Sequence, residues 1–384
     1  MGISCDRSHD KYDICLINAP TVLDPTSSTF FVADPTSFTE HIRPHPRKWE
    51  NSLMSRIREV TITSSSGPTS PKCDVQHNLP ALVFSLGGYT GNFWHEFNDM
   101  FIPLFITVNS FFPDQDIVLV ISRAADWWVR KYAELLQAFS THRILNLDND
   151  TATHCFPSAT LGLISHGFMT VDPTLIPNSK TFVHFRALVE RAYNHRSKHN
   201  NSPTTRPRLV MVSRTGNVGR VILNQAEVKR VVQEIGFDVI MFEPTPSTPL
   251  HQAYALINSS HAMIGVHGAA LTHSLFLRPG SVFVQVVPIG LEWVAEVCFG
   301  TSARAMGLEY MEYRINAEES SLIEKYDKND LVIKDPVSFR GKDWSEVGMN
   351  VYLKEQNVRL DLFRFREYLK RAYKKAKKFI DKQG

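Results

Sequence analysis

The stretch AMIGVHGAALTHSLFL, residues 262–277, carries the features that decide the fold. Residues 262–266 form a short apolar run, which is typical of a strand buried on both faces of a parallel sheet. Residues 269–277 follow with an apolar helical pattern. A buried strand that leads within two residues into a helix predicts one βα unit of an α/β domain.

The turn between this strand and this helix consists of His267, Gly268 and Ala269. Glycine and alanine allow a ligand to approach the backbone closely, and a helix N-terminus offers free N–H groups and a positive dipole end. These features suit a diphosphate, to which His267 adds a hydrogen bond or a charge. The same residues also fit a tight turn with a structural histidine, and the pattern alone supports the two interpretations equally.

Strands and helices alternate along the rest of the C-terminal half. We predict further strands at residues 208–213, 237–242, 281–287 and 308–314. We predict helices at residues 225–235, 250–258 and 292–306. This alternation indicates a doubly wound α/β domain over residues 206–350, which binds ligands at the C-terminal ends of its strands.

A second α/β domain is predicted over residues 81–205. Its buried strands are expected at residues 81–85, 116–121 and 143–147. Its helices are expected at residues 92–109 and 126–139. Two Rossmann-like domains of this kind would face each other across a ligand cleft.

The two ends of the chain have a different texture. Residues 1–80 are rich in Pro, Ser, Thr and Asp and predict an irregular lead-in with one strand at residues 58–63. Residues 351–384 predict a C-terminal basic helix that can cross back toward the first domain.

A loop with anion-binding chemistry follows the strand at residues 208–213. It contains Arg214 and Arg220, whose planar guanidinium groups suit phosphate oxygens, and Asn224 after it is expected to cap the next helix. By itself the loop fits an exposed surface loop better. Because the carboxyl ends of parallel strands share one edge of a sheet, the arginines and His267 are expected to meet, which favours a shared anion site.

The sequence GNFWHEFND, residues 91–99, predicts a possible proton-transfer site in the first domain. His95 and Asp99 are spaced i and i+4 and share one face of a helix, so Asp99 would orient the imidazole and His95 would act as a general base. Glu96 points away from that face and is a second candidate for the base. The competing interpretation, ordinary polar residues at a helix N-terminus, is slightly favoured on the pattern alone.

Two DxD triplets compete as a metal-binding feature, because such triplets hold divalent cations against diphosphates in many enzymes. They begin at Asp114 and Asp148. The loops best suited to phosphate lie elsewhere, so we predict no metal site. Walker A and GxGxxG patterns are also absent from the sequence, which gives no support to a P-loop or nicotinamide enzyme.

Composition limits the remaining function classes. The 384 residues carry a formal net charge of +3, which is too small to indicate nucleic-acid binding, and the basic run at residues 370–378 fits a solvated helix end. No run approaches the length of a membrane span, and residues 5–10 are polar where a signal peptide would be apolar. We therefore expect a soluble chain, such as the lumenal part of a longer product whose anchor is missing.

Cysteines and sequons give weak support for a secretory compartment. There are five cysteines, none in a CxxC or zinc-binding spacing, and a disulfide could tie down the irregular N-terminal region. Three possible N-glycosylation triplets begin at Asn149, Asn200 and Asn258.

Taken together, these segments resemble glycosyltransferase family 61. The resemblance runs from about residue 30 to residue 372, and its most specific parts are residues 91–99, the Arg214–Arg220–Asn224 region and residues 265–277. The surrounding sequence looks like the plant branch of the family, which includes Golgi enzymes that decorate xylan with arabinofuranose or xylose.

The resemblance implies a two-domain GT-B fold, an inverting mechanism and no obligatory metal. It implies that Arg214, Arg220, Asn224 and the turn His267-Gly268-Ala269 bind a UDP-sugar, either UDP-arabinofuranose or UDP-xylose. His95, Asp99 and Glu96 carry over as acceptor-side candidates.

Three activities follow from the resemblance as expectations. The first is pentosyl transfer to xylan in the Golgi lumen. The alternatives are xylosyl transfer to an N-glycan core and a non-catalytic glycan-binding role. The chain departs from the family pattern in two respects: it lacks the membrane anchor of plant members, and it has Ala270 where many members have glycine.

Overall fold

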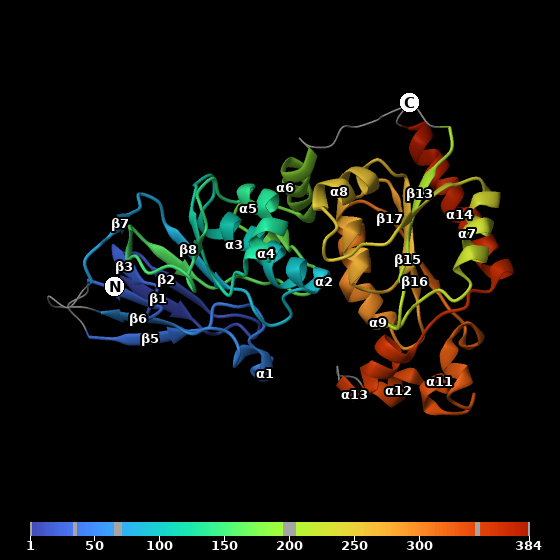
Figure 1. The fold of residues 1–384 in the computed structure, drawn as a ribbon, viewed down its shortest axis with the longest axis horizontal. Helices are drawn as coiled ribbons and strands as arrows, with labels where there is room; N and C mark the ends of the chain where they lie inside the picture. Colours follow the sequence, from blue (N-terminus) through green and yellow to red (C-terminus); the bar gives the residue numbers. More distant parts are fainter. Residues whose placement is uncertain (1, 34–36, 65–70, 195–204, 342–345, 383–384) are drawn as a thin grey trace. The chain divides into compact units, whose positions relative to one another are not determined.

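The computed structural model describes residues 2–33, 37–64, 71–194, 205–341 and 346–382 (Figure 1). The chain divides into two compact units, Met1–Ala192 and Tyr193–Gly384. The sequence pattern predicts this boundary near residue 205 instead.

Within its described residues, the N-terminal unit contains two six-stranded sheets. The first sheet contains, in spatial order, β1 (Ile3–Asp6), β2 (Ile14–Ile17), β12 (Ala159–Leu161), β8 (Ala81–Ser85), β9 (Val118–Ser122) and β10 (Leu145–Asn146). The second contains β5 (Thr39–Ile42), β6 (Val60–Ser64), β4 (Thr29–Val32), β3 (Thr21–Asp24), β11 (His154–Phe156) and β7 (Val75–Gln76). One cluster of buried apolar side chains draws on both sheets, so the sheets pack face to face.

The prediction of an irregular lead-in over residues 1–80 is wrong. β6 corresponds to the strand predicted at residues 58–63, but β1 to β5 and β7 also lie in this region. These strands contain only two to four residues each. An alternation of apolar and polar residues cannot be recognised in segments that short. Phe30 and Ile62, on paired strands, are fully buried in the shared core.

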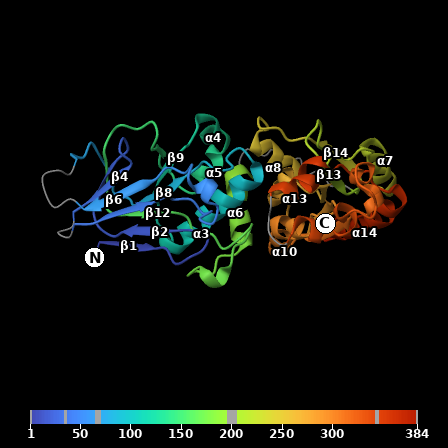
Figure 2. The same ribbon diagram turned by 90° about the horizontal axis from the view of Figure 1, so that it is seen from below.

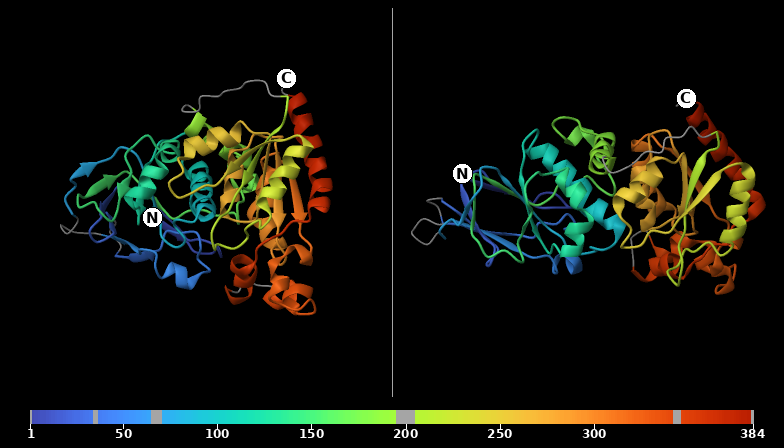
Figure 3. Two further views of the ribbon diagram at one scale, coloured as in Figure 1. Left: turned by 45° about the vertical axis from the view of Figure 1, so that its right-hand side comes forward. Right: turned by 45° about the horizontal axis from the view of Figure 1, so that its top comes forward.

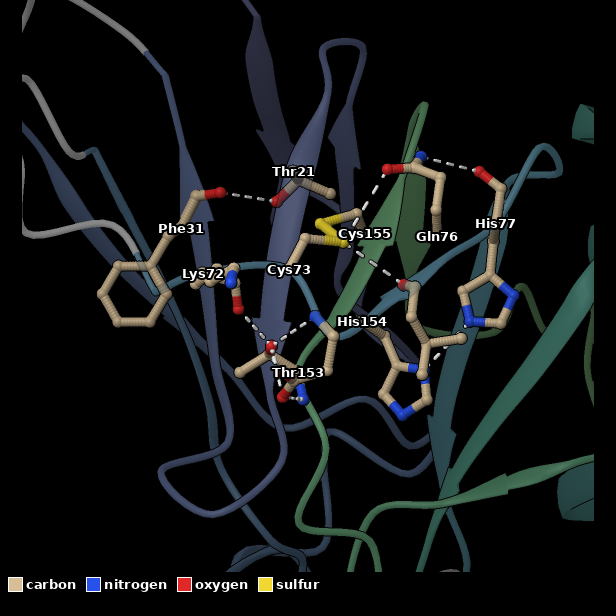
Figure 4. The surroundings of a disulfide bond; sticks show 11 residues. Thr21, Phe31, Lys72, Cys73, Gln76, His77, Thr153, His154 and Cys155 are labelled. Carbon is tan, nitrogen blue, oxygen red and sulfur yellow. Dashed lines mark hydrogen bonds between the residues drawn. A yellow bond between two sulfur atoms is a disulfide. The ribbon is translucent and has the colours of Figure 1, made fainter.

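Two disulfides tie together segments of this unit, as the cysteine content suggested. Cys5 and Cys15 face each other across the β1–β2 pair and are bonded. Cys73 is bonded to Cys155 of β11 (Figure 4). Cys298, in the other unit, is buried and takes part in no disulfide among the described residues.

The helix predicted at residues 92–109 forms with an interruption. α2 (Phe93–Glu96) continues into a π-helical turn, η1 (Phe97–Phe101), and then into α3 (Ile102–Phe111). Pro103 has no N–H to donate to the carbonyl of Asp99, and its ring would clash there, so the wider turn resolves the conflict.

Helices and sheets of the N-terminal unit lie on separate sides of it (Figure 3). The other helices of this unit are α1 (Asn51–Met54), α4 (Asp126–Lys131), α5 (Ala133–Gln137), η2 (Pro173–Leu175) and α6 (Phe182–Tyr193).

The C-terminal unit is a doubly wound α/β fold, as predicted. Its parallel sheet has the spatial order β14 (Asp238–Phe242), β13 (Arg208–Val212), β15 (Ala262–Val266), β16 (Val282–Val287) and β17 (Glu309–Arg314). In chain order this is 2-1-3-4-5, so the winding direction reverses between β13 and β15. Ligands of open α/β sheets bind at such a reversal, beyond the carboxyl ends of the strands.

Helices cover both faces of this sheet (Figures 1 and 3). α7 (Gln225–Ile235) and α8 (Leu250–Asn258) have the predicted bounds, whereas the helix after β15 is a 3-10 helix, η4 (Ala269–Phe276). The helix predicted at residues 292–306 contains a π-helical turn and consists of α9 (Glu292–Ala295), η5 (Glu296–Gly300) and α10 (Thr301–Ala305).

The C-terminal basic helix, α14 (Leu362–Asp381), packs within the C-terminal unit, where it contacts α7, β16 and β17 (Figure 2). The expectation that it crosses back toward the first domain is therefore wrong. Its strongly amphipathic sequence buries Phe365, Leu369 and Ala372 on this sheet. Short helices lie in the described parts of residues 317–355: η6 (Ala317–Glu319), η7 (Ser321–Glu324), α11 (Leu331–Lys334), α12 (Pro336–Arg340), α13 (Glu346–Asn350) and η8 (Val351–Glu355).

Candidate functional site

Two loops of the C-terminal unit meet at the point where the strand order reverses. Arg214 and Arg220 lie on the loop after β13, and His267 and Gly268 directly follow β15. A Cβ atom placed on Gly268 would lie 2.4 Å from Arg214 Nη1 and 3.3 Å from Arg220 Nη1. Both guanidinium groups therefore converge on the backbone of Gly268, as the sequence predicted.

The two arginines form a concentrated positive charge. Arg220 donates from Nη1 to the carbonyl of His267 at 3.1 Å, and Arg214 donates from Nε to the carbonyl of Gly219 at 3.2 Å. Neither forms an ion pair with any carboxylate among the described residues. Burial lowers the pKa of both guanidinium groups. The pKa of Arg220 falls to about 9, because the charge of Arg214 adds to the effect of burial.

An uncompensated cationic pair costs free energy in the empty protein, and an anion would relieve that cost. In the part of the chain that the structure describes, the buried Arg220 Nε has no hydrogen-bond partner. The backbone of Arg220 adopts a left-handed conformation, with φ of 57°. Strain and unpaired donors of this kind are typical of ligand-binding sites.

A buried relay fixes the protonation state of His267. Gln285 Nε2 lies 2.8 Å from His267 Nδ1, and the Tyr310 hydroxyl lies 2.6 Å from Gln285 Oε1. The Tyr310 hydroxyl also lies 3.0 Å from Glu312 Oε1, so its single proton has two acceptors within reach. The Gln285 amide presents its N–H₂ to the imidazole, so in the neutral ring Nδ1 accepts and Nε2 carries the proton. Burial, together with the charges of Arg220 and Arg214, lowers the pKa of His267 to about 3. His267 is therefore a neutral hydrogen-bond donor.

Sequence reasoning missed Gln285. It is fully buried on β16, opposite Gly265 of β15. The available signal was one amide side chain inside the apolar run Val282–Val287. A polar residue in a buried strand requires a partner, and His267 is that partner.

The start of η4 supplies backbone donors. Leu271 N donates to the Gly268 carbonyl, and among the described residues no hydrogen bond uses the N–H groups of Ala269 and Ala270. These groups lie next to Gly268 and are free to bind an anion. Ala270 is half-buried.

The assignment of Asn224 to donor binding is contradicted by its contacts. Its side chain is buried, donates from Nδ2 to the Leu360 carbonyl at 2.9 Å and accepts from Leu360 N at 3.0 Å. It also makes no capping hydrogen bond to α7. Both ends of the amide are committed to holding the segment that precedes α14.

In the N-terminal unit, Asp99 holds His95. His95 Nδ1 lies 2.8 Å from Asp99 Oδ2, and Asp99 Oδ1 accepts from Arg47 Nη1 at 2.9 Å and from Asn98 Nδ2 at 2.7 Å. Burial raises the pKa of Asp99, but the His95 hydrogen bond and the Arg47 charge outweigh it and lower that pKa to about 2. Because the ionised Asp99 accepts from Nδ1, the neutral imidazole keeps Nε2 as an acceptor.

Glu96 has a structural environment. It is buried, its Oε1 accepts from Gly91 N at 2.6 Å, and its Oε2 accepts from Trp128 Nε1 at 2.7 Å. Burial raises the pKa of Glu96 to about 7, despite these two donors. The glutamate braces the start of α2, whereas His95 keeps part of its side chain exposed.

Comparison with known proteins bears on both groups. The profile of the family described as Glycosyltransferase 61 matches residues 93–284, half of the chain, a span that includes His95, Arg214 and His267. The xylan glycosyltransferase MUCI21 of Arabidopsis thaliana is 40% identical over 98% of this chain and 80% of its own length. The chain belongs to glycosyltransferase family 61. It is a glycosyltransferase.

Other family 61 relatives come from rice, Oryza sativa subsp. japonica. The alpha-1,3-arabinosyltransferase XAT3 is 33% identical over 96% of this chain, which spans 64% of that relative's length. The beta-1,2-xylosyltransferase XYXT1 is 33% identical over 96% of this chain and 83% of its own length. Among solved structures, the Escherichia coli glycosyltransferase TibC aligns at a TM-score of 0.30 with 11% identity over 74% of this chain and 77% of its own, too slight a likeness to inform the fold.

The acidic triplets of this family 61 chain have protein partners. Asp148 pairs with Arg58 at 2.6 Å, Asp150 lies 3.1 Å from His154 Nε2, and the Asp116 carboxylate accepts from Thr141 Oγ1 at 2.5 Å. Among the residues described, no group of three or more His, Cys, Asp and Glu side chains could hold a metal ion.

The glycosylation triplets differ in accessibility. Asn149 is exposed after β10, and Asn200 lies outside the described residues. Asn258 is buried within α8, where a glycan has no room, so the prediction for Asn258 is wrong. None of the described helices is both long and apolar enough to cross a bilayer.

Proposed function

We propose that this enzyme transfers a pentose, arabinofuranose or xylose, from a UDP-sugar to xylan, with inversion at the anomeric carbon. The C-terminal unit binds the donor, and the N-terminal unit binds the acceptor. His95 is the general base, and Asp99 orients it. Arg214, Arg220, His267 and the N–H groups at Ala269 bind the diphosphate.

One observation carries the donor site: two half-buried arginines, which have no carboxylate partner among the described residues, converge on Gly268 at the reversal of the strand order. A diphosphate supplies two negative charges and several acceptor oxygens, which satisfies both guanidinium groups. The neutral His267 donates from Nε2 without adding a third positive charge. A small monoanion such as chloride would leave most of these donors unused.

The proposed chemistry is a single displacement. An acceptor hydroxyl gives its proton to His95 Nε2 as its oxygen attacks the anomeric carbon, and the bond from that carbon to the UDP oxygen breaks. Negative charge develops on the leaving diphosphate, where the preorganised arginines stabilise it. Asp99 stabilises the imidazolium that forms at His95. Transfer requires donor and acceptor to share one cleft, so a GT-B arrangement of the two units is part of the proposal.

Xylan as the acceptor is supported by the names of the similar plant enzymes, which include arabinosyl- and xylosyltransferases. The disulfides Cys5–Cys15 and Cys73–Cys155 suit an oxidising compartment, which supports a Golgi lumenal location. The alternatives are xylosyl transfer to an N-glycan core and a glycan-binding role without turnover.

A donor and acceptor screen tests the proposal. The purified protein is incubated with UDP-arabinofuranose or UDP-xylose and xylohexaose, and UDP release and product linkage are measured. We expect UDP release that depends on xylohexaose, together with an anomeric configuration inverted from that of the donor. Turnover only with N-glycan cores would select the first alternative, and UDP-independent glycan binding without turnover would select the second.

A further inference from the structure

An arc of aromatic side chains extends from His95 across the N-terminal unit. Four residues form this aromatic arc: Tyr89, Trp94, Phe168 and Trp49. The His95 ring lies 4.3 Å from the Tyr89 ring and 4.8 Å from the Trp94 ring, between centroids. Phe168 then lies 6.0 Å from Trp94 and 6.3 Å from Trp49. Each step is comparable with the size of one sugar ring.

Parts of the aromatic arc face solvent. Trp49 is 44% exposed and Tyr89 is 40% exposed, whereas large aromatic side chains are normally mostly buried. Trp94 and Phe168 are half-buried. Exposed aromatic surface gathered beside a candidate base marks a ligand-binding surface.

The arc is held rigid from beneath by groups that also hold His95. The Arg47 guanidinium lies 5.0 Å from the Trp49 ring and 5.2 Å from the Tyr89 ring, and it donates to Asp99. The Tyr89 hydroxyl donates to Glu50, which also accepts from Arg47. Trp49 and Tyr89 are thereby fixed relative to the His95–Asp99 pair.

Phe168 is anchored to the helical segment that carries His95 and Asp99. Its neighbour Met169 donates from its backbone N–H to Asn98 Oδ1 at 2.7 Å, and Asn98 Nδ2 donates to Asp99. Met169 adopts a left-handed backbone conformation with φ of 45°, which is costly for a non-glycine residue. Three segments that are distant in sequence are thus preorganised around Asn98 and Asp99.

The charge beneath the aromatic arc selects a neutral ligand. Arg47 is matched by the two carboxylates of Glu50 and Asp99, so the cluster offers no positive charge to a phosphate or a uronate. The negative faces of aromatic rings instead attract the weakly positive C–H faces of pyranose rings. A neutral polysaccharide therefore fits this surface better than an acidic one.

We propose that the aromatic arc is an acceptor subsite that binds consecutive pyranose rings of a neutral β-linked polysaccharide backbone and places a hydroxyl at His95. This inference rests on the proposed function, because transfer to xylan sets how the bound polysaccharide runs from His95 along the aromatic arc. Trp94 and Tyr89 position the sugar that reacts, and Phe168 and Trp49 bind the sugars farther along. Trp49 is a specificity residue for acceptor length.

Titration of xylohexaose and xylobiose into the full chain tests the subsite. We expect Trp49→Ala and Phe168→Ala to weaken xylohexaose binding about tenfold each, as loss of an aromatic contact does. Xylobiose, which is too short to span the arc from His95, should lose little affinity in Trp49→Ala. Trp49→Phe keeps a ring and should recover part of the binding.

Trp127→Ala is the matched control, because Trp127 is 46% exposed in the same unit and has no ring contact with the arc among the described residues. It should bind xylohexaose like the wild type, and an unchanged melting temperature and circular dichroism spectrum in every variant shows that the N-terminal unit is folded. Equal xylohexaose affinity in wild type, Trp49→Ala and Phe168→Ala overturns the inference, as does a wild type that binds no xylohexaose. Arc-dependent binding without pentosyl transfer would support the subsite while refuting the proposed reaction.

Discussion

Gln285 Nε2, within the buried strand β16, donates a hydrogen bond to Nδ1 of His267, the residue that follows β15, across 2.8 Å. Because Nδ1 accepts this hydrogen bond, the proton of the neutral imidazole lies on Nε2. A histidine placed beside Arg214 and Arg220 would otherwise repel them if it were protonated, or present a lone pair to the phosphate. The relay avoids both outcomes.

We predict that His267 stays neutral, with its proton on Nε2, from pH 5 to pH 8. The pKa of His267 is lowered to about 3 by burial and by the two arginines, so protonation begins only well below pH 5. Nitrogen chemical shifts of the imidazole report the tautomer directly. An imidazolium signal at pH 6, or a proton on Nδ1, would contradict the relay.

The Gln285→Met variant separates the relay from packing, because methionine has a similar shape but cannot donate. It leaves His267 Nδ1 buried without a donor, which costs about 1–3 kcal/mol of unfolding free energy. UDP affinity should also fall. If the variant binds UDP as well as the wild type does, Gln285 is only a core residue.

Arg214→Ala should nearly abolish transfer while leaving the fold intact. Loss of a preorganised donor to the leaving group lowers kcat/KM by about 10²–10³-fold. The melting temperature should be unchanged or higher, because burial and the neighbouring charge of Arg214 both disfavour the Arg220 cation. Arg230→Ala, which removes an exposed arginine on α7, is the matched control. A folded, fully active Arg214→Ala protein would refute the donor assignment.

Gly268→Ala should weaken UDP binding through displacement of Arg214. The added Cβ would lie 2.4 Å from Arg214 Nη1, and the backbone, with φ of 161°, accepts alanine without strain. The loss of one charge-assisted contact corresponds to a roughly tenfold or greater loss of affinity. In an Arg214→Ala background the same change should have little further effect, because the clash is gone. Additive losses in that double-mutant cycle would mean that Gly268 acts independently of Arg214.

The sequence predicted the C-terminal unit closely because its strands are contiguous apolar runs bounded by glycine, proline or charge. β15, α7 and α8 have the predicted bounds. The short strands near the N-terminus were missed because burial there depends on pairing with strands far along the chain. β3, for example, pairs with β11, some 130 residues away.

The candidate site was predictable where its groups lie in local motifs, and not where they converge through the fold. His95 and Asp99 are one helical turn apart, and the loops after β13 and β15 had to meet at one sheet edge. Arg47, in contrast, reaches Asp99 from 52 positions away. The role expected of Asn224 failed because its partner, Leu360, lies 136 positions away.

Asp99→Asn should lower the rate of transfer without weakening UDP binding. An amide at this position no longer matches the Arg47 and Asn98 donors and cannot stabilise the imidazolium at His95. General-base catalysis typically contributes about 10²–10⁴-fold, which sets the expected loss in kcat. His95→Ala should lose a similar amount, and the double variant should lose little more. A wild-type kcat in the Asp99→Asn variant would contradict the assignment of His95 as the general base.

Glu96 provides a prediction about stability that is independent of the reaction. The pKa of Glu96 is about 7 in the folded chain, against an ordinary value of 4.5, chiefly because of burial. A carboxyl with a raised pKa binds more protons in the folded state, so its contribution to stability is complete below about pH 4.5 and is lost as the pH rises through 7. The Glu96→Gln side chain cannot titrate.

The difference in unfolding free energy, wild type minus Glu96→Gln, should therefore decrease between pH 5 and pH 8, by up to about 3 kcal/mol. Denaturant unfolding at a series of pH values measures that difference. Parallel curves for the two proteins would show that the Gly91 and Trp128 donors keep Glu96 ionised across the whole range, and the glutamate would then brace α2 as a carboxylate.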